Sequence, residues 1–162
     1  MKKLIFILTL LTPFFSGSAY EMVKDFTFTD LEDKPHKMSD YKGKWVLVNY
    51  WASNCPPCIA EIPDIDRFYV DNKDKFTVLG MDTMGSNVED IVAFAKKMSI
   101  HYPLVQYQDS TMLAFGIVMA IPTSYIISPK GEIVEKYTGI ITYDDLDYFV
   151  NPPILKKKLS QK

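Results

Sequence analysis

Two cysteines, Cys55 and Cys58, are the residues whose type and spacing point most directly to chemistry. They are the only cysteines among 162 residues, and Pro56 and Pro57 separate them. A pair with this spacing could form a structural disulfide, bind a metal ion, or cycle between a dithiol and a disulfide. The rest of the sequence discriminates between these three readings.

A structural disulfide at this position would stabilise the fold only weakly. Closing a loop of four residues removes about 2 kcal/mol of denatured-state entropy, against about 3 kcal/mol for a loop of about 15 residues, and tight loops add strain. Strained disulfides in short loops are the readily reduced ones. The spacing therefore favours a redox-active pair over a structural bridge.

A metal site is the second reading. Zinc would need two further ligands, but His36 and His101 lie 19 residues before and 43 residues after the cysteines, without paired spacing. We therefore predict no zinc site. Copper(I) accepts thiolate and thioether ligands, so a Cu(I)-binding module using Cys55 and Cys58 stays an alternative, although methionines in apolar runs usually fill cores. The candidate methionines are Met81, Met84, Met98 and Met119.

The redox interpretation is supported by the position of the cysteines. They follow a dense apolar run at 45–51, typical of a buried strand, and precede a helical pattern. A thiol where a strand ends and a helix begins lies near unpaired backbone N–H groups and the positive end of the helix dipole, which favours its thiolate. Cys55 has that place, and Cys58, one turn further, is the resolving thiol. Pro56 and Pro57 lack an N–H, so they remove two donors to the Cys55 thiolate and predict a less oxidising pair.

Glu61 lies three residues beyond Cys58 on the same predicted helix. Its carboxylate would disfavour a neighbouring thiolate and could accept a proton from Cys58. The alternative is an ordinary glutamate in the first turn that complements the helix dipole. Pro63 is expected to kink this helix, because its ring displaces the hydrogen bond to Ile59.

The elements that must position these residues alternate along the chain. Hydrophobic periodicity and turn residues predict one α/β domain with a mixed sheet, half parallel and half antiparallel, flanked by helices. The 20 residues 110–129 carry no formal charge, but Gly116 and Pro122 indicate buried core elements and not a membrane span. The expected strands are 26–29, 45–51, 76–81, 102–105, 122–127 and 132–137. The expected helices are one that begins at Cys55 and has its apolar positions from Ile59 to Tyr69, and those at 88–98, 109–115 and 143–150.

The N-terminus has the composition of an export signal. Lys2 and Lys3 precede an apolar run that ends in small residues, which predicts a signal peptide at 1–19 cleaved after Ala19; a retained N-terminal anchor is the alternative. Domain boundaries follow at 20–150, with a basic tail at 151–162. Cleavage would change the balance from 18 basic and 20 acidic residues to 16 and 20, so the net charge falls from −2 to −4. No nucleic-acid partner is expected from this balance.

The segment around the cysteines resembles the active site of extracytoplasmic thioredoxin-like proteins of the TlpA/ResA type. The resemblance covers nearly all of 22–150, including a central inserted helix and short strand at 94–104. A tryptophan four residues before the first cysteine, a glutamate three after the second, and Ile-Pro-Thr some 65 residues downstream make it specific. The matching segments are Val48 to Pro63, Ala120 to Ile127, and Lys130 to Ile133 with Gly139.

This resemblance implies a thioredoxin fold in which Pro122 is cis and lies against the disulfide. It implies that the backbone of Ile121 pairs with a bound substrate segment, and it adds Pro122 and Trp51 to the substrate-binding residues. Relatives of this type have an asparagine where Asn49 stands and use the glutamate that Glu61 matches. The implied catalytic residues are thus Cys55, Cys58 and Glu61.

Two positions depart from the family pattern. Asn54 replaces the tryptophan that usually precedes the first cysteine, which removes an apolar wall from the partner surface. Thr123 follows the proline where the cytochrome c maturation reductases called CcmG usually have glutamate, so the chain is more similar to the general TlpA/ResA group.

The sequence thus predicts a thiol-disulfide oxidoreductase that acts outside the cytoplasm and reduces disulfides of exported proteins. The resemblance implies a periplasmic location. It needs no cofactor besides the Cys55–Cys58 disulfide. The resemblance implies substrates such as apocytochrome c or metal-site proteins, and a membrane electron donor of the DsbD/CcdA type. A disulfide-forming oxidant stays an alternative, whereas a peroxidase is disfavoured because thioredoxin-fold peroxidases lack this CxxC arrangement.

Overall fold

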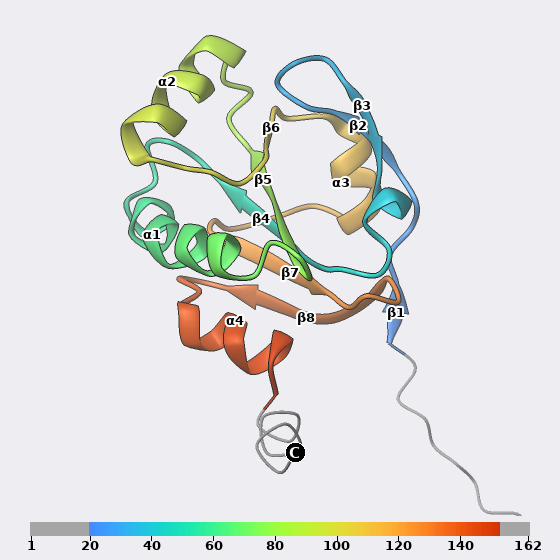
Figure 1. The fold of residues 1–162 in the computed structure, drawn as a ribbon. Coiled ribbons are helices and arrows are strands. Elements are labelled where there is room, and N and C mark those ends of the chain that lie inside the picture. The colour runs from blue at the N-terminus through green and yellow to red at the C-terminus, as the bar shows by residue number, and fades with distance from the viewer. Residues whose placement is uncertain (1–19, 153–162) are drawn as a thin grey trace, which may run out of the picture.

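A mixed six-stranded sheet with helices on both faces forms the centre of the structure, a computed structural model that describes residues 20–152 (Figure 1). The signal-peptide prediction and most of the basic tail lie outside the described residues. The elements in chain order are β1 (Glu21–Met22), β2 (Thr27–Thr29), β3 (Pro35–Lys37), the 3-10 helix η1 (Met38–Tyr41), β4 (Trp45–Trp51), α1 (Pro56–Asp71), β5 (Phe76–Asp82), α2 (Val88–Met98), β6 (Leu104–Val105), α3 (Asp109–Phe115), β7 (Thr123–Ile127), β8 (Glu132–Thr138) and α4 (Tyr143–Val150).

The strands of the main sheet lie in the order β1-β8-β7-β4-β5-β6. β4, β5 and β6 are parallel to one another, whereas β7 is antiparallel to β4 and β8 is antiparallel to β7. The predicted division into a parallel and an antiparallel half is confirmed. Because two reversals restore the direction, β8 runs the same way as β4 and β5, and all three end at one edge of the sheet. We call this edge, where the cysteines follow β4, the disulfide edge.

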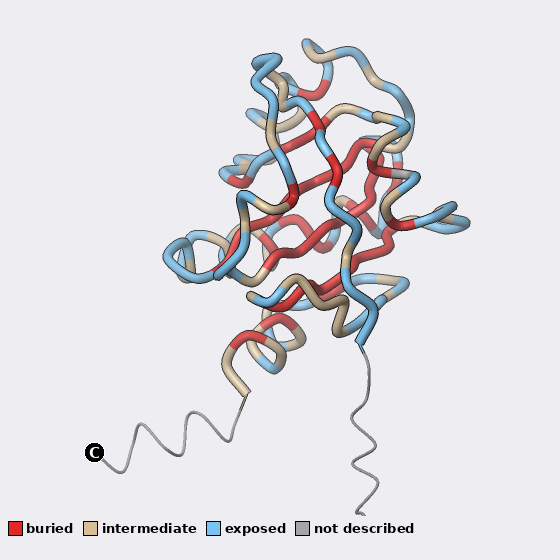
Figure 2. The backbone as a smooth tube through the Cα atoms, turned by 90° about the vertical axis from the view of Figure 1, so that its right-hand side faces the viewer, coloured by how far each residue is buried: buried red, intermediate tan, exposed pale blue. Residues whose placement is uncertain are grey.

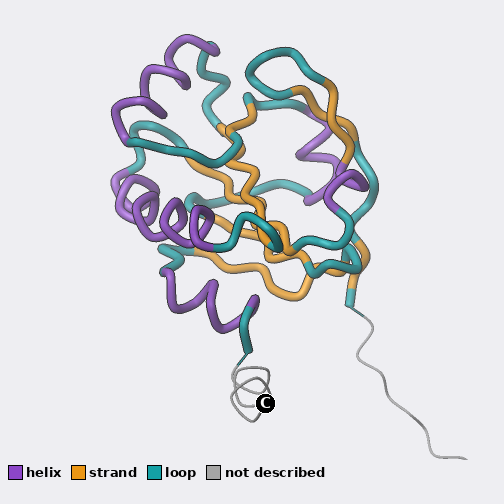
Figure 3. Tube along the Cα trace, viewed as in Figure 1, coloured by secondary structure: helices purple, strands orange, loops and turns teal. Residues whose placement is uncertain are grey.

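Each face of the sheet has its own hydrophobic core, and the central strands β4, β5 and β7 are buried apart from Trp45, the first residue of β4 (Figure 2). Alternate side chains of β4 point to opposite faces, as the pleat requires. Leu47 and Trp51 pack in the core shared with α1, α2 and α4, while Val46, Val48 and Tyr50 pack in the core shared with the β2–β3 hairpin and α3. Figure 3 shows α1, α2 and α4 on one side of the strands and α3 on the other. Asn49 therefore faces α1.

Most predicted elements are confirmed within a residue or two, and the elements that were missed are the short β1, β3 and η1. β3 and η1 were not expected, because Pro35, His36 and Lys37 have no apolar alternation. Their pairing depends on tertiary contacts: the His36 ring stacks on Phe28 with centroids 5.4 Å apart, and its Nε2 lies 2.9 Å from Oδ2 of Asp30.

Helix α1 continues through Pro63 as a single element. The kink expected at Pro63 stays a prediction. The uncharged stretch at 110–129 divides between α3 and β7, as predicted. Among residues 20–152, no helix has the length and apolarity that a membrane crossing requires.

Candidate active site

The disulfide lies where β4 gives way to α1. Cys55 is the N-cap of α1, in extended backbone, and is bonded to Cys58 with a Cα–Cα distance of 5.3 Å. Pro56 and Pro57 occupy the first two helical positions, so the N–H of Cys58 is the first amide of the helix, and it donates to Sγ of Cys55 at 3.3 Å. This matches the prediction from the two prolines: their positions contribute no donor to the outer sulfur.

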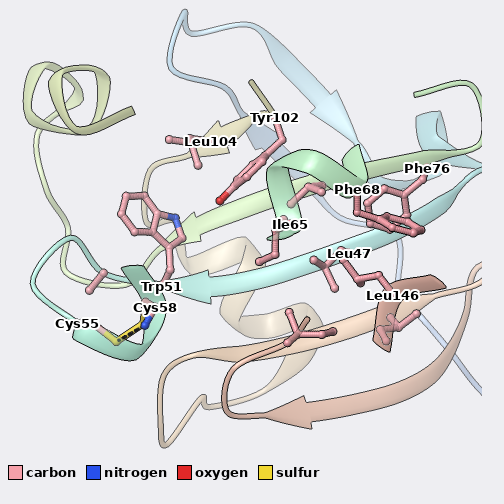
Figure 4. Close-up of a cluster of buried hydrophobic side chains, with 14 of the residues drawn as sticks. Leu47, Trp51, Cys55, Cys58, Ile65, Phe68, Phe76, Tyr102, Leu104 and Leu146 are labelled. Atoms are coloured by element: carbon pink, nitrogen blue, oxygen red, sulfur yellow. Dashed lines mark hydrogen bonds between the residues drawn. A yellow bond between two sulfur atoms is a disulfide. The ribbon is translucent and has the colours of Figure 1, made fainter. Parts of the chain in front are cut away.

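The two sulfurs differ in accessibility. Cys55 is 8% exposed and Cys58 is fully buried, which agrees with the outer cysteine as nucleophile and the inner one as resolving thiol. Figure 4 shows the disulfide beside Trp51 at the end of β4.

The segment before β7 completes the outer side of the site. The Ile121–Pro122 peptide bond is cis, as the resemblance implied, and Pro122 is buried. The carbonyl oxygen of Ile121 lies 3.9 Å from Sγ of Cys55. Although 66 residues separate them in sequence, Ile121 and Cys55 are therefore neighbours, and a polypeptide bound at this sulfur would meet the Ile121 backbone.

Glu61 lies on the inner side and is 1% exposed. One of its oxygens, Oε1, accepts a hydrogen bond from Nδ2 of Asn49 at 2.7 Å, and Oε2 accepts one from the backbone N–H of Ile141 at 3.0 Å. Burial raises the pKa of Glu61 from 4.5 to about 7, against the two hydrogen bonds, which act to lower it. A carboxyl group with a pKa near neutrality both accepts and returns a proton readily at physiological pH.

The position of Glu61 relative to Cys58 follows from the helix. Residues three apart share one face of an α-helix, and both of these side chains are buried on the face of α1 that packs against the sheet. The shared buried face is compatible with the predicted proton transfer from Cys58 to Glu61, which stays a prediction. The alternative of an ordinary, solvated glutamate in the first turn does not fit its burial.

The sequence did not predict that the Asn49 side chain and the Ile141 amide bind Glu61. Asn49 donates a second hydrogen bond from Nδ2 to Oγ of Ser124, at 3.0 Å, and both side chains are buried. A single amide in an otherwise apolar strand is the signal that could have indicated such a role for Asn49. The contribution of Ile141 comes from its backbone, for which the sequence has no signal.

Trp51 lies at the end of β4, next to the disulfide-bearing turn (Figure 4), and is 3% exposed. Its ring stacks on Phe94 with centroids 5.1 Å apart, and its Nε1 has no hydrogen-bond partner within residues 20–152. Gly80 gives the ring its space, because a Cβ there would lie 3.3 Å from Nε1 and only 2.6 Å from a methyl group of Leu104. The structure thus gives Trp51 a packing role, and its contact with substrate stays a prediction.

The candidate copper-binding methionines differ in their exposure to solvent. Met81 is buried in the core opposite α1, whereas Met84 and Met119 are 60% and 88% exposed. Within the described range, no group of three or more His, Cys, Asp or Glu side chains could hold a metal ion.

A disulfide at the start of a helix, a cis-proline beside its outer sulfur, and a buried carboxyl on the side of its inner sulfur define a dithiol–disulfide exchange protein with a thioredoxin-like fold. The comparisons with known proteins agree. Residues 20–136 match the AhpC/TSA family model, and the chain belongs to this family.

Two of the similar proteins have names that state this chemistry, and a third shows the same fold. The thiol-disulfide oxidoreductase ResA of Geobacillus kaustophilus is 32% identical over 124 residues, covering 76% of this chain and 71% of that protein. A thiol:disulfide interchange protein from Bacteroides sp. is 27% identical, with a TM-score of 0.69 over 83% of this chain and 91% of the other. StoA from Bacillus subtilis has the same fold, with a TM-score of 0.65, 24% identity and coverage of 78% and 96%. The chain is a thiol-disulfide oxidoreductase.

Proposed function

We propose that this protein reduces disulfides of exported proteins outside the cytoplasm. The observation that carries the direction is the N-terminus of α1, where Pro56 and Pro57 contribute no N–H and Cys58 donates to Sγ of Cys55. A thiolate with fewer donors is less stabilised, so the dithiol gives up its electrons more readily. The predicted signal peptide and the similarity to ResA support an extracytoplasmic location.

The reaction transfers two electrons from the dithiol to the substrate. The Cys55 thiolate attacks one sulfur of the substrate disulfide, forms a mixed disulfide and releases the other substrate sulfur as a thiolate. Cys58 passes its proton to Glu61 and attacks Sγ of Cys55. The Cys55–Cys58 disulfide forms and the second substrate sulfur leaves. Substrates such as apocytochrome c or metal-site proteins, and re-reduction by a membrane donor of the DsbD/CcdA type, follow from the resemblance to TlpA/ResA proteins.

The reduction potential of the Cys55–Cys58 couple tests the direction. We expect a value on the reducing side of protein disulfide isomerase, below about −180 mV, by equilibration with glutathione or dithiothreitol. A value near about −120 mV, typical of strong oxidants, would reverse the proposal and favour the disulfide-forming alternative.

A trapping experiment tests the substrate class. In the Cys58→Ala variant the mixed disulfide on Cys55 cannot be resolved, so exported proteins with reducible cysteines should accumulate as covalent adducts that dithiothreitol releases. Absence of any protein adduct would contradict a protein substrate.

Anaerobic titration with Cu(I) tests the copper alternative, which requires stoichiometric binding that is lost when Met84 or Met119 is replaced.

A further inference from the structure

Three loops meet the Cys55–Cys58 turn at the disulfide edge. The first follows β5: both the N–H and the hydroxyl of Thr83 donate to the carbonyl oxygen of Trp51, at 3.0 Å. The second precedes β7 and brings the carbonyl of Ile121 to within 3.9 Å of Sγ of Cys55. Met84 and Met119 lie one and two residues from these contacts.

The third loop follows β8 and lies against both sides of the site. The N–H of Gly139 donates to the carbonyl oxygen of Pro122 at 2.9 Å, and the N–H of Ile141 donates to Glu61. Ile140, between them, is 44% exposed.

These loops present large apolar side chains to solvent. We call this set the apolar rim: Met84, Met119 and Ile140, which are 60%, 88% and 44% exposed. Exposed apolar groups on loops that contact a disulfide-bearing turn indicate a contact surface for a partner. Methionine side chains are flexible and polarizable, so they adapt to partners of different shape.

The rim is free of formal charge in every segment that builds it. The segments 49–60, 83–88, 110–129 and 137–143 contain no Asp, Glu, Lys or Arg. A charged side chain pressed against this surface would lose its hydration without gaining a partner. The surface therefore disfavours substrates with a charge directly beside the reacting cysteine.

Acidic residues occupy the first turns of two helices that begin at the disulfide edge. Helices α2 and α4 begin at the disulfide edge, because they follow β5 and β8, and their first turns carry acids. The basic residues of α2, Lys96 and Lys97, are in its last turn, at the far end. The charges in the two first turns are Glu89, Asp90, Asp144 and Asp145.

We propose that the apolar rim selects disulfide-bearing polypeptide segments in which uncharged, apolar residues flank the cysteine and basic residues lie further out. This inference rests on the proposed function and specifies its substrate class. The rim covers the apolar flanks, and the acidic first turns of α2 and α4 attract the outer basic residues by charge complementarity.

Reduction of three peptides by the reduced, mature protein tests the selection. The peptides carry the same disulfide, flanked by leucine, by aspartate, or by leucine with lysine further out. We expect the leucine peptide to react about 10-fold faster than the aspartate peptide, and the leucine–lysine peptide to react fastest at low salt. High salt should remove only the advantage from lysine, because salt screens exposed charges. Equal rates for the three peptides would overturn the inference.

Two variants locate the effect. Met119→Glu should reduce the leucine-to-aspartate rate ratio severalfold, whereas Leu113→Glu, at a 75% exposed residue of α3 outside the rim, should leave the ratio as in the wild type. An unchanged ratio in Met119→Glu would overturn the inference. A concentration-dependent dimer that Met119→Glu abolishes would also overturn it, because a second copy would then occupy the rim. If the wild type fails to reduce even the small neutral hydroxyethyl disulfide, the proposed function itself fails.

Discussion

The outer and inner halves of the active site differ in exposure and in their polar partners, although only two residues separate Cys55 from Cys58. Cys55, in the outer half, is partly accessible and lies beside the Ile121 carbonyl and the uncharged apolar rim. Cys58, in the inner half, is fully buried on the same helical face as Glu61. This contrast supports the proposed function, in which the outer half contacts another polypeptide and the inner half moves a proton away from solvent.

The two halves are also held differently. The inner half joins three strands or their ends to α1 through buried hydrogen bonds: Asn49 of β4 binds Glu61 and Ser124 of β7, and Ile141 after β8 binds Glu61. The outer half consists of loops whose side chains are largely exposed. Changes to the inner half should therefore alter the pH dependence of catalysis and stability, whereas changes to the rim should alter partner choice.

The largest expected effect is on resolution of the mixed disulfide. In Glu61→Gln, Cys58 loses its internal proton acceptor, so the release of reduced substrate should slow by about 100-fold at neutral pH. In the wild type this rate should rise through about pH 7 as Glu61 ionises, and the variant should lack that rise. Stopped-flow measurement of the decay of a preformed mixed disulfide across pH gives both quantities.

The matched control is Asp82→Asn, which removes another buried carboxylate from the disulfide edge. Asp82 accepts hydrogen bonds from the N–H and hydroxyl of Ser86 in its own loop, at 2.8 and 3.2 Å, and the structure gives it no bond to α1. In Asp82→Asn, the rate of resolution of the mixed disulfide should rise with pH as it does in the wild type. A loss of the rise in Asp82→Asn, or its persistence in Glu61→Gln, would remove the distinction between the halves.

The second effect is on the free energy of unfolding of the oxidised protein. Folding raises the pKa of Glu61 from 4.5 to about 7, so the folded state holds the proton more tightly than the unfolded state. This contribution is fully present below about pH 4.5 and is lost as pH rises through about 7, a decrease of about 3 kcal/mol. Urea unfolding at about pH 5 and about pH 8 should show a decrease of about 2–3 kcal/mol in the wild type relative to Glu61→Gln.

The third and smallest effect concerns Asn49. Asn49→Ala removes a donor that stabilises the ionised form of Glu61, so the midpoint of the pH–rate profile should move upward by about one pH unit. Ser124→Ala leaves the Asn49–Glu61 hydrogen bond in place and should shift the midpoint less. The profiles of the two variants, measured on the same mixed disulfide, rank the two hydrogen bonds. A downward shift in Asn49→Ala would contradict its role as a donor to the carboxylate.

Sequence reasoning reached the reactive sulfurs because their chemistry is local. The spacing of Cys55 and Cys58, the apolar strand before them and the two prolines between them define a thiol at a helix start without reference to distant residues. The place of Glu61 one helical turn after Cys58 indicated a proton acceptor, which the resemblance to TlpA/ResA proteins supported. The cis bond at Pro122 came from that resemblance alone. The main strands and helices were predicted within a residue or two because their apolar periods are regular.

Other parts could be decided only by the tertiary structure. The β2–β3 hairpin depends on the contacts of His36, and the pKa of Glu61 near 7 depends on the burial of its carboxyl group. The hydrogen bond from the Ile141 amide to Glu61 joins residues 80 positions apart in sequence. The physical reason is the same in each case. Periodicity and helix position are properties of neighbouring residues, whereas desolvation and long-range hydrogen bonds arise only when separate elements pack together.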